Sequence, residues 1–335
     1  MIRVLGIGDN VCDKYLHRKM MYPGGNALNV AVFAKYMGRE SAYLGTFGDD
    51  EVARHVYSVL QELEVDLSHC RLEQGENGCA RVRLEEGERV FLPGNRGGVA
   101  GVKPPVLSRL DEEYISGFGL VHTSIFSYME EELPKIRRAA RFVSMDFSDR
   151  YDGEYLKKCC PYLDCAEISC GGMEEGKIRE TMDRIMELGC RHIVIATRGS
   201  EGAYVMVDGR IYGQSACLVK PVDTMGAGDS FIASFLVNYL EGISQAVDFG
   251  EGSGSRGIVR AAEYKDLLIR LSLYRAAVFS AQQCRRDGSF GFGREMELTR
   301  EDKRVMEEAE SKKSEGLCGN SQNHQKNNRL QREKL

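Results

Sequence analysis

The residues best suited to chemistry lie in one run, Asp223-Thr224-Met225-Gly226-Ala227-Gly228-Asp229. Apolar residues recur after this run at helical spacing, which predicts that a helix begins here. Gly226, Ala227 and Gly228, called the anion turn below, would form its first turn, where unpaired N–H groups and the helix dipole favour a phosphate. A carboxylate repels a neighbouring anion, so Asp229 is best explained as the acceptor of a proton from a group attacking that phosphate. An ordinary helix start, with Asp229 interacting with the dipole, remains the alternative.

A second polar group follows the first predicted strand, residues 2–7. Asp9 and Asp13 come just after this strand, where open α/β sheets bind their ligands. Gly24 and Gly25 would let the backbone approach a ligand closely, while the amides of Asn26 and Asn29 can both donate and accept hydrogen bonds. These groups suit a molecule rich in hydroxyls, although a polar turn is the simpler explanation of either aspartate alone.

Together the two runs resemble the two signatures of the ribokinase, or PfkB, family of sugar kinases. Residues 223–229 match Asp-Thr-x-Gly-Ala-Gly-Asp, and residues 24–29 match Gly-Gly-x-x-x-Asn. The resemblance extends from about residue 1 to residue 293. Within the family it is strongest to fructoselysine 6-kinases, on the stretches Gly8-Asp9-Asn10-Val11-Cys12-Asp13, Asp146-Phe147-Ser148-Asp149 and Asp223-Thr224-Met225.

The resemblance implies an α/β fold of the ribokinase-like type, with a central, mostly parallel sheet flanked by helices and a small β-sheet lid. Strands at about 11–22 and 81–92, with a turn at 86–88, would form the lid, through which a homodimer could assemble. Alternating strand and helix patterns from residue 120 onward independently predict a parallel sheet. The implied reaction is ATP-dependent phosphorylation of a sugar hydroxyl, most specifically the 6-hydroxyl of fructoselysine or a related amine-linked ketose.

The resemblance also implies roles for individual residues. Asp229 would be the general base and the anion turn would hold the charge of the transferring phosphate. The sugar would contact Asp9, Asp13, Gly25, Asn26, Asn29 and Asn95. The nucleotide would lie along Thr197, Gly199, Gly202, Thr224, Gly226 and Gly228.

The implied metal site lacks part of the family's sequence motif. Relatives organise Mg²⁺ with an Asn-x-x-Glu motif, but residues 169–175 contain no asparagine. Glu174 or Glu175 would hold Mg²⁺ through water, unless each is simply an acid at a helix N-terminus. Asp223 would help to place a monovalent cation, K⁺. His122 and His192 have no partner pattern and are predicted to be structural.

Bulk composition limits the partners and the compartment. The 335 residues carry a net charge of −5, which gives no argument for nucleic acid, and no apolar run reaches the length of a membrane span. The eleven cysteines show no metal-binding or disulfide spacing, so reduced thiols and a cytoplasmic protein are expected.

Two segments depart from the predicted kinase domain, residues 1–294. The glycine- and serine-rich stretch at about 244–262 is predicted to be a mobile surface insertion. Residues 295–335 are charged and then rich in Asn, Gln and Lys, which predicts a frayed helix followed by disorder.

Other functions remain open. The chain could phosphorylate a different ketose or a nucleoside, or it could be a non-catalytic regulator that binds a sugar or nucleotide. Gly6-Ile7-Gly8 could begin a dinucleotide fingerprint of an oxidoreductase. That reading is disfavoured because Val11 occupies the third glycine position.

Overall fold

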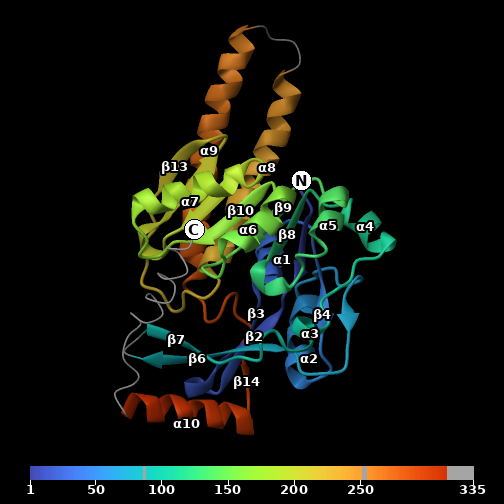
Figure 1. The fold of residues 1–335 in the computed structure, drawn as a ribbon, viewed down its shortest axis with the longest axis vertical. Coiled ribbons are helices and arrows are strands. Elements are labelled where there is room, and N and C mark those ends of the chain that lie inside the picture. The colour runs from blue at the N-terminus through green and yellow to red at the C-terminus, as the bar shows by residue number, and fades with distance from the viewer. Residues whose placement is uncertain (86–87, 251–254, 315–335) are drawn as a thin grey trace.

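A central sheet of nine strands forms the body of the molecule (Figure 1). The computed structural model describes residues 1–85, 88–250 and 255–314. From one edge to the other, the strands are β13 (Arg210–Gln214), β12 (Ala203–Val207), β11 (Ile193–Thr197), β10 (Cys165–Ser169), β9 (Val143–Asp146), β8 (Leu120–Ser124), β1 (Val4–Gly8), β4 (Ser41–Phe47) and β5 (Arg71–Leu72). Strands β11 to β5 pair in parallel, and β12 and β13 add an antiparallel edge. The predicted fold class is confirmed.

Helices cover both faces of this sheet and enclose a separate core on each. On one face lie α1 (Asn26–Tyr36), α2 (Glu51–Glu62), α8 (Ala227–Gly250) and α9 (Ser255–Gln283). On the other lie α4 (Arg109–Ile115), α5 (Leu133–Ala139), α6 (Gly153–Cys159) and α7 (Glu175–Glu187). The inner strands are buried on both faces, which explains why β1, β4 and β8 are buried along their whole length.

A second sheet of five strands lies beside the carboxyl ends of the parallel strands (Figure 1). Its order is β14 (Arg294–Glu295), β3 (Met20–Gly24), β2 (Val11–Tyr15), β6 (Gly78–Glu85) and β7 (Glu88–Leu92), and we call it the lid. The predicted lid strands are therefore confirmed, and β6 and β7 pair as an antiparallel hairpin. The predicted turn between them includes residues 86–87, which lie outside the described residues. The short helix α3 (Gly98–Val102) follows β7.

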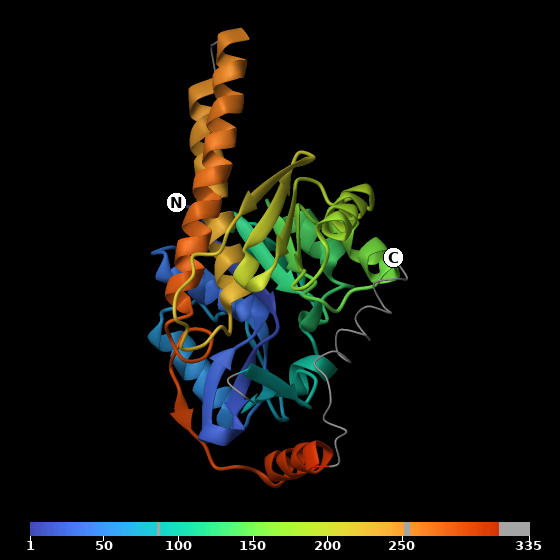
Figure 2. The same cartoon turned by 90° about the vertical axis from the view of Figure 1, so that its left-hand side faces the viewer.

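The predicted surface insertion at 244–262 has a different structure. Helix α8 continues to Gly250 and α9 begins at Ser255, so two long helices project from the body side by side (Figures 1 and 2). Within the stretch 244–262, only the backbone of residues 251–254 lies outside the described part. Gly242 lets the helices approach closely, because a Cβ there would lie 2.3 Å from Leu268 Cδ1. One glycine within a helix costs only about 1 kcal/mol. Gly250 and Gly257 lie one in each helix, so neither prevents its helix from forming.

The domain boundary predicted at residue 294 is also wrong. Residues 294–295 form the edge strand of the lid, and α10 (Arg300–Ser314) packs beneath it (Figure 1). On the described part of α10, Asp302, Val305 and Ala309 are buried, at the i, i+3, i+7 spacing of a single helix face. The prediction of disorder beyond this helix falls on residues 315–335, outside the described residues.

Neither long helix has membrane character: among the described residues, no helix is both long and apolar enough to cross a bilayer. No disulfide joins the cysteines in the same part of the chain, and most of their side chains are buried. A buried free cysteine packs as a small apolar residue.

The packing of α10 limits how much of the tail is dispensable. The buried residues on the described part of α10, Asp302, Val305 and Ala309, all precede a deletion of residues 312–335. We expect the melting temperature and the activity of the protein to remain within measurement error of the full chain. A lower melting temperature in differential scanning fluorimetry would show that this last segment packs on the body.

Candidate active site

The anion turn requires glycine for two reasons. Gly226 has a φ of +70°, and a Cβ added there would lie 2.9 Å from Ser289 Cβ. Helix α8 begins one residue later, and its first turn includes Gly228, whose Cβ position is open. The N–H of Ala227 donates to the carbonyl of Thr224 at 3.2 Å. The turn therefore presents chiefly the amides of Gly228 and Asp229 to an anion.

Asp229 lies where the first turns of α8 and α1 meet. Its Oδ1 accepts a hydrogen bond from Asn26 Nδ2 at 2.8 Å, and its Oδ2 accepts one from Asn29 Nδ2 at 2.5 Å. Asn29 Nδ2 also lies 3.2 Å from Ser289 Oγ, near the anion turn. The structure thus brings together three polar residues that the two sequence signatures contain some two hundred positions apart.

A further carboxylate, on Asp146 at the end of β9, completes this cluster. Asn26 Nδ2 donates to Asp146 Oδ2 at 2.6 Å, so one amide group bridges Asp146 and Asp229. Burial raises the pKa of Asp146 to about 6, despite hydrogen bonds from Ser148 and Asn26 that lower it. Burial first, and then the charge of Asp146, raise the pKa of Asp229 well above its usual range. Such a carboxylate is a stronger base than a free aspartate.

His122, predicted to be merely structural, orients this bridging amide. Because both N–H groups of Asn26 point at carboxylates, its Oδ1 must accept, and His122 Nε2 lies 2.8 Å away. The other ring nitrogen, Nδ1, lies 2.8 Å from Ser144 Oγ. The imidazole is fully buried, and burial lowers its pKa to about 3, so it is neutral with its hydrogen on Nε2. No spacing rule in the sequence links position 122 to position 26.

Asp9, one of the predicted sugar contacts, is held by hydrogen bonds within the protein. Its carboxylate accepts hydrogen bonds from the N–H groups of Asn26 (2.5 Å) and Ala27 (3.1 Å) and from the hydroxyls of Ser124 (2.7 Å) and Ser127 (2.8 Å). Four donors fill the acceptor capacity of a carboxylate. Asp9 therefore caps α1 in place of a side chain at Gly25, which has none to offer.

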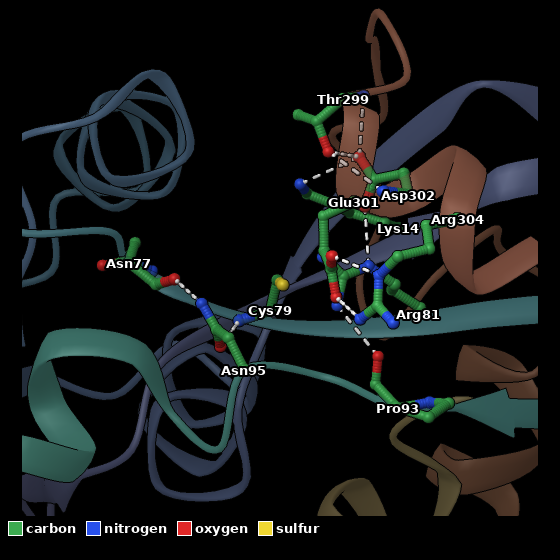
Figure 3. Close-up of polar contacts among 10 residues, drawn as sticks. All are labelled: Lys14, Asn77, Cys79, Arg81, Pro93, Asn95, Thr299, Glu301, Asp302 and Arg304. Carbon is green, nitrogen blue, oxygen red and sulfur yellow. Dashed lines mark hydrogen bonds and ion pairs between the residues drawn. The ribbon is translucent and has the colours of Figure 1, made fainter.

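The other predicted sugar residues divide into two groups. Asp13 lies on the site side of the lid: a Cβ added at Gly24 would lie 2.7 Å from Asp13 Oδ2 and 3.5 Å from Ser289 Oγ, which is beside the anion turn. Gly25, with a φ of +119° and Asn10 Cα 2.8 Å from an added Cβ, shapes the turn before α1. Asn95 does not join them: its Oδ1 accepts from the N–H of Cys79 at 2.8 Å and its Nδ2 donates to the carbonyl of Asn77 at 2.7 Å (Figure 3). Its amide organises the loop after β7 instead.

The predicted nucleotide loop follows β11, at the carboxyl ends of the parallel strands. Thr197 ends this strand, and the glycines at 199 and 202 have φ values of +58° and +100°. An added Cβ at Gly202 would lie 2.0 Å from the carbonyl oxygen of Gln214, whereas space above Gly199 is open. The loop is therefore a constrained turn with one open glycine surface, which suits a close ligand approach.

The two acids predicted to organise Mg²⁺ lie at the start of α7. Glu174 is exposed at the N-cap position. Glu175 Oε1 accepts a hydrogen bond from Tyr204 at 2.5 Å and pairs with Arg198 at 3.5 Å. Tyr204 and Arg198 therefore account for the position of the Glu175 carboxylate without a metal ion. Among the described residues, no three His, Cys, Asp or Glu side chains are grouped to hold a metal.

Asp223, predicted to place a monovalent cation, ties three segments together. Its Oδ2 accepts hydrogen bonds from Tyr15 Oη at 2.5 Å and from the N–H of Gly288 at 3.0 Å, and its Oδ1 accepts from the N–H of Met225 at 3.0 Å. Tyr15 belongs to the lid strand β2, and Met225 precedes the anion turn. Asp223 thus fixes the sugar side of the site relative to the phosphate side.

Comparison with known proteins identifies this arrangement. The family model described as pfkB family carbohydrate kinase matches residues 3–259. The chain belongs to the pfkB family of carbohydrate kinases. It is 36% identical over 293 residues to the fructosamine kinase FrlD of Bacillus subtilis (strain 168), an alignment covering 87% of this chain and 94% of the relative. It is 31% identical over 254 residues to the fructoselysine 6-kinase of Escherichia coli (strain K12), covering 75% and 95% of the two chains.

Solved structures support the fold. A fructokinase double mutant from Vibrio cholerae O395, in a form bound to fructose, ADP and a potassium ion, superposes with a TM-score of 0.62. The two share 20% sequence identity, and the match covers 87% of this chain and 94% of that one. The chain is therefore a carbohydrate kinase with a ribokinase-like fold, and an oxidoreductase is excluded as its family.

The role of His122 can be tested by a matched pair of substitutions. His122→Phe removes the donor to Asn26, whose amide can then rotate and present oxygen to a carboxylate. We expect kcat to fall by about 10-fold to 10²-fold with little change in either KM, because misplacement of a catalytic group acts on turnover. His122→Gln supplies an N–H donor and should recover much of the loss. A folded His122→Phe enzyme with wild-type kcat would contradict the positioning role.

Proposed function

We propose that the protein transfers the γ-phosphate of ATP to the 6-hydroxyl of fructoselysine or a closely related amine-linked ketose. The observation that carries this proposal is the Asp229 carboxylate, held by Asn26 and Asn29 at the first turn of α8. Asp229 takes the proton of the sugar hydroxyl as its oxygen attacks phosphorus. The amides of the adjacent turn stabilise the charge on the transferring phosphate, where fixed N–H donors contribute several kcal/mol.

The nucleotide half of the proposal is supported by the loop after β11 and by the anion turn. Both are glycine-bearing turns, and Thr224 lies between Asp223 and the anion turn. Mg²⁺ would be bound largely by the phosphates themselves and would neutralise their charge. Glu174 is the exposed acid left to hold a metal-bound water, and K⁺ is a candidate ion near Asp223.

The charge of the site supports an amine-linked substrate. Asp13, Asp146 and Asp229 form an acidic cluster, and after burial the charges of Asp146 and Asp13 contribute to the raised pKa of Asp229. Fructoselysine carries a secondary amine next to its ketose ring, and this cation is attracted to carboxylates more strongly when the lid excludes water. The two relatives named for fructosamine and fructoselysine support the same substrate class.

Two features of the proposal concern the whole protein. The family and the described thiols support a cytoplasmic enzyme. We also propose a homodimer that assembles through the lid. Helix α10 covers part of the lid surface opposite the site, so a partner on that surface must bind α10 or displace it.

Asp229→Asn tests the base. The substitution keeps the shape of the side chain but cannot accept the proton, so kcat should fall by about 10²–10⁴-fold with small changes in both KM values. Wild-type kcat should also fall as pH drops through the raised carboxylate pKa, because the base works only when deprotonated. Asp183→Asn, on the exposed face of α7, is the control and should behave as wild type. Near wild-type turnover of Asp229→Asn would exclude this residue as the base.

The substrate is tested by measuring kcat/KM for fructoselysine, fructose and ribose under the same conditions. We expect fructoselysine to be preferred, because only it places a cation near the acidic cluster. Added salt should narrow the preference if the charges interact through solvent. A higher kcat/KM for fructose or ribose would favour the alternative, a kinase of a plain ketose. No ADP release with any sugar would favour a binding regulator.

A further inference from the structure

Helix α10 attaches to the lid through one buried carboxylate (Figure 3). The Asp302 side chain is 0% exposed, although it belongs to a run of charged residues. Its carboxylate caps its own helix, accepting from Thr299 Oγ1 at 2.7 Å, while Thr299 Oγ1 accepts from the N–H of Asp302 at 3.1 Å. This reciprocal pairing fixes where α10 begins and therefore where the carboxylate points.

The same carboxylate reaches both central strands of the lid. Oδ1 accepts a hydrogen bond from Arg81 Nε on β6 at 2.6 Å, and Oδ2 lies 3.5 Å from Lys14 Nζ on β2. Lys14 and Arg81 are direct partners in the parallel pairing of β2 with β6. Asp302 thus bridges the two strands at one level, from outside the sheet.

All three charged side chains of this bridge are buried. Lys14 and Arg81 are only 8% and 6% exposed, so Asp302 is a counter-ion that water cannot easily replace. Burial alone would raise the pKa of Asp302, but the hydrogen bond from Arg81, with those from Thr299 and the charge of Lys14, lowers it. The group is therefore ionised at neutral pH, between two buried cations.

The opposite side of β2 faces the active site. Side chains alternate along a strand, so Lys14 points to α10 while its neighbours Asp13 and Tyr15 point the other way. Tyr15 donates to Asp223 beside the anion turn, and the charge of Asp13 raises the pKa of Asp229. One strand thus connects the counter-ion of α10 with a residue predicted to contact the sugar.

We propose that α10 is an integral part of the lid and that Asp302 is a positioning residue for the sugar. By holding β2 against β6 from outside, it sets the position of Asp13 on the inside. This inference rests on the proposed function, since it takes the Asp13 side of β2 as the side that meets the substrate.

The test compares the full chain, Asp302→Asn and a deletion of residues 299–335. Asp302→Asn retains the shape but leaves Lys14 and Arg81 without a counter-charge. We expect KM for fructoselysine to rise by about tenfold or more, while KM for ATP stays within about twofold. Glu307→Gln removes a charge from an exposed position of the same helix and should match the full chain.

Amide hydrogen exchange provides a readout that does not depend on the substrate. In both variants, exchange should become faster in β2 and β6 but stay unchanged in β8 and β9 of the central sheet. If the full chain fails to phosphorylate fructoselysine, the proposed substrate is wrong and exchange alone decides the role of α10. If the deletion fails to fold, Asp302→Asn decides it.

Two results would overturn the proposal. Unchanged exchange in β2 and β6 of Asp302→Asn would show that the lid does not depend on this carboxylate. Faster exchange spread equally over the lid and the central sheet would show that Asp302 contributes only to general stability. In the second case, KM for ATP and KM for the sugar should rise together.

Discussion

The burial of neighbouring carboxylates is the constraint on which the active site depends. Asp9, Asp146 and Asp229 converge where α1 and α8 begin, and the donors that hold them in the described structure are neutral amides and hydroxyls. Burial, and then the charges of neighbouring carboxylates, raise the pKa values of Asp146 and Asp229, and the neutral donors do not cancel those charges. A site of this kind can both accept a proton near neutral pH and attract a cationic substrate.

The outer side of the lid holds its buried carboxylate with cations as well as neutral donors. On this side Asp302 forms ion pairs with two cations, Lys14 and Arg81. Strand β2 therefore carries an ion-paired side chain on one surface and an acidic residue, Asp13, on the other. Negative charge is kept on the surface that faces the substrate, and the helix that carries Asp302 comes from the far end of the chain.

Features set by local sequence were predictable, whereas features set by distant partners were not. The anion turn was predictable because Gly226 needs a positive φ and a Cβ-free surface, and both leave a glycine in the sequence. The hydrogen bonds of Asp9 were not predictable because its serine donors lie more than a hundred residues away. Asp302 was missed because Glu301, Lys303 and Arg304 around it are typical of a solvated helix. The spacing of Val305 and Ala309 was the available signal.

The hydrogen bonds of Asp223 have a consequence for substrate exchange. If a sugar enters and leaves by movement of β2 away from the anion turn, that movement breaks the contact between Tyr15 and Asp223. Hydrogen bonds to charged groups contribute about 1.5–3 kcal/mol each, so the open form is disfavoured by roughly that amount before any ligand binds. The residue that aligns the two halves of the site therefore also sets a minimum cost for opening it, and product release must overcome that cost in every turnover.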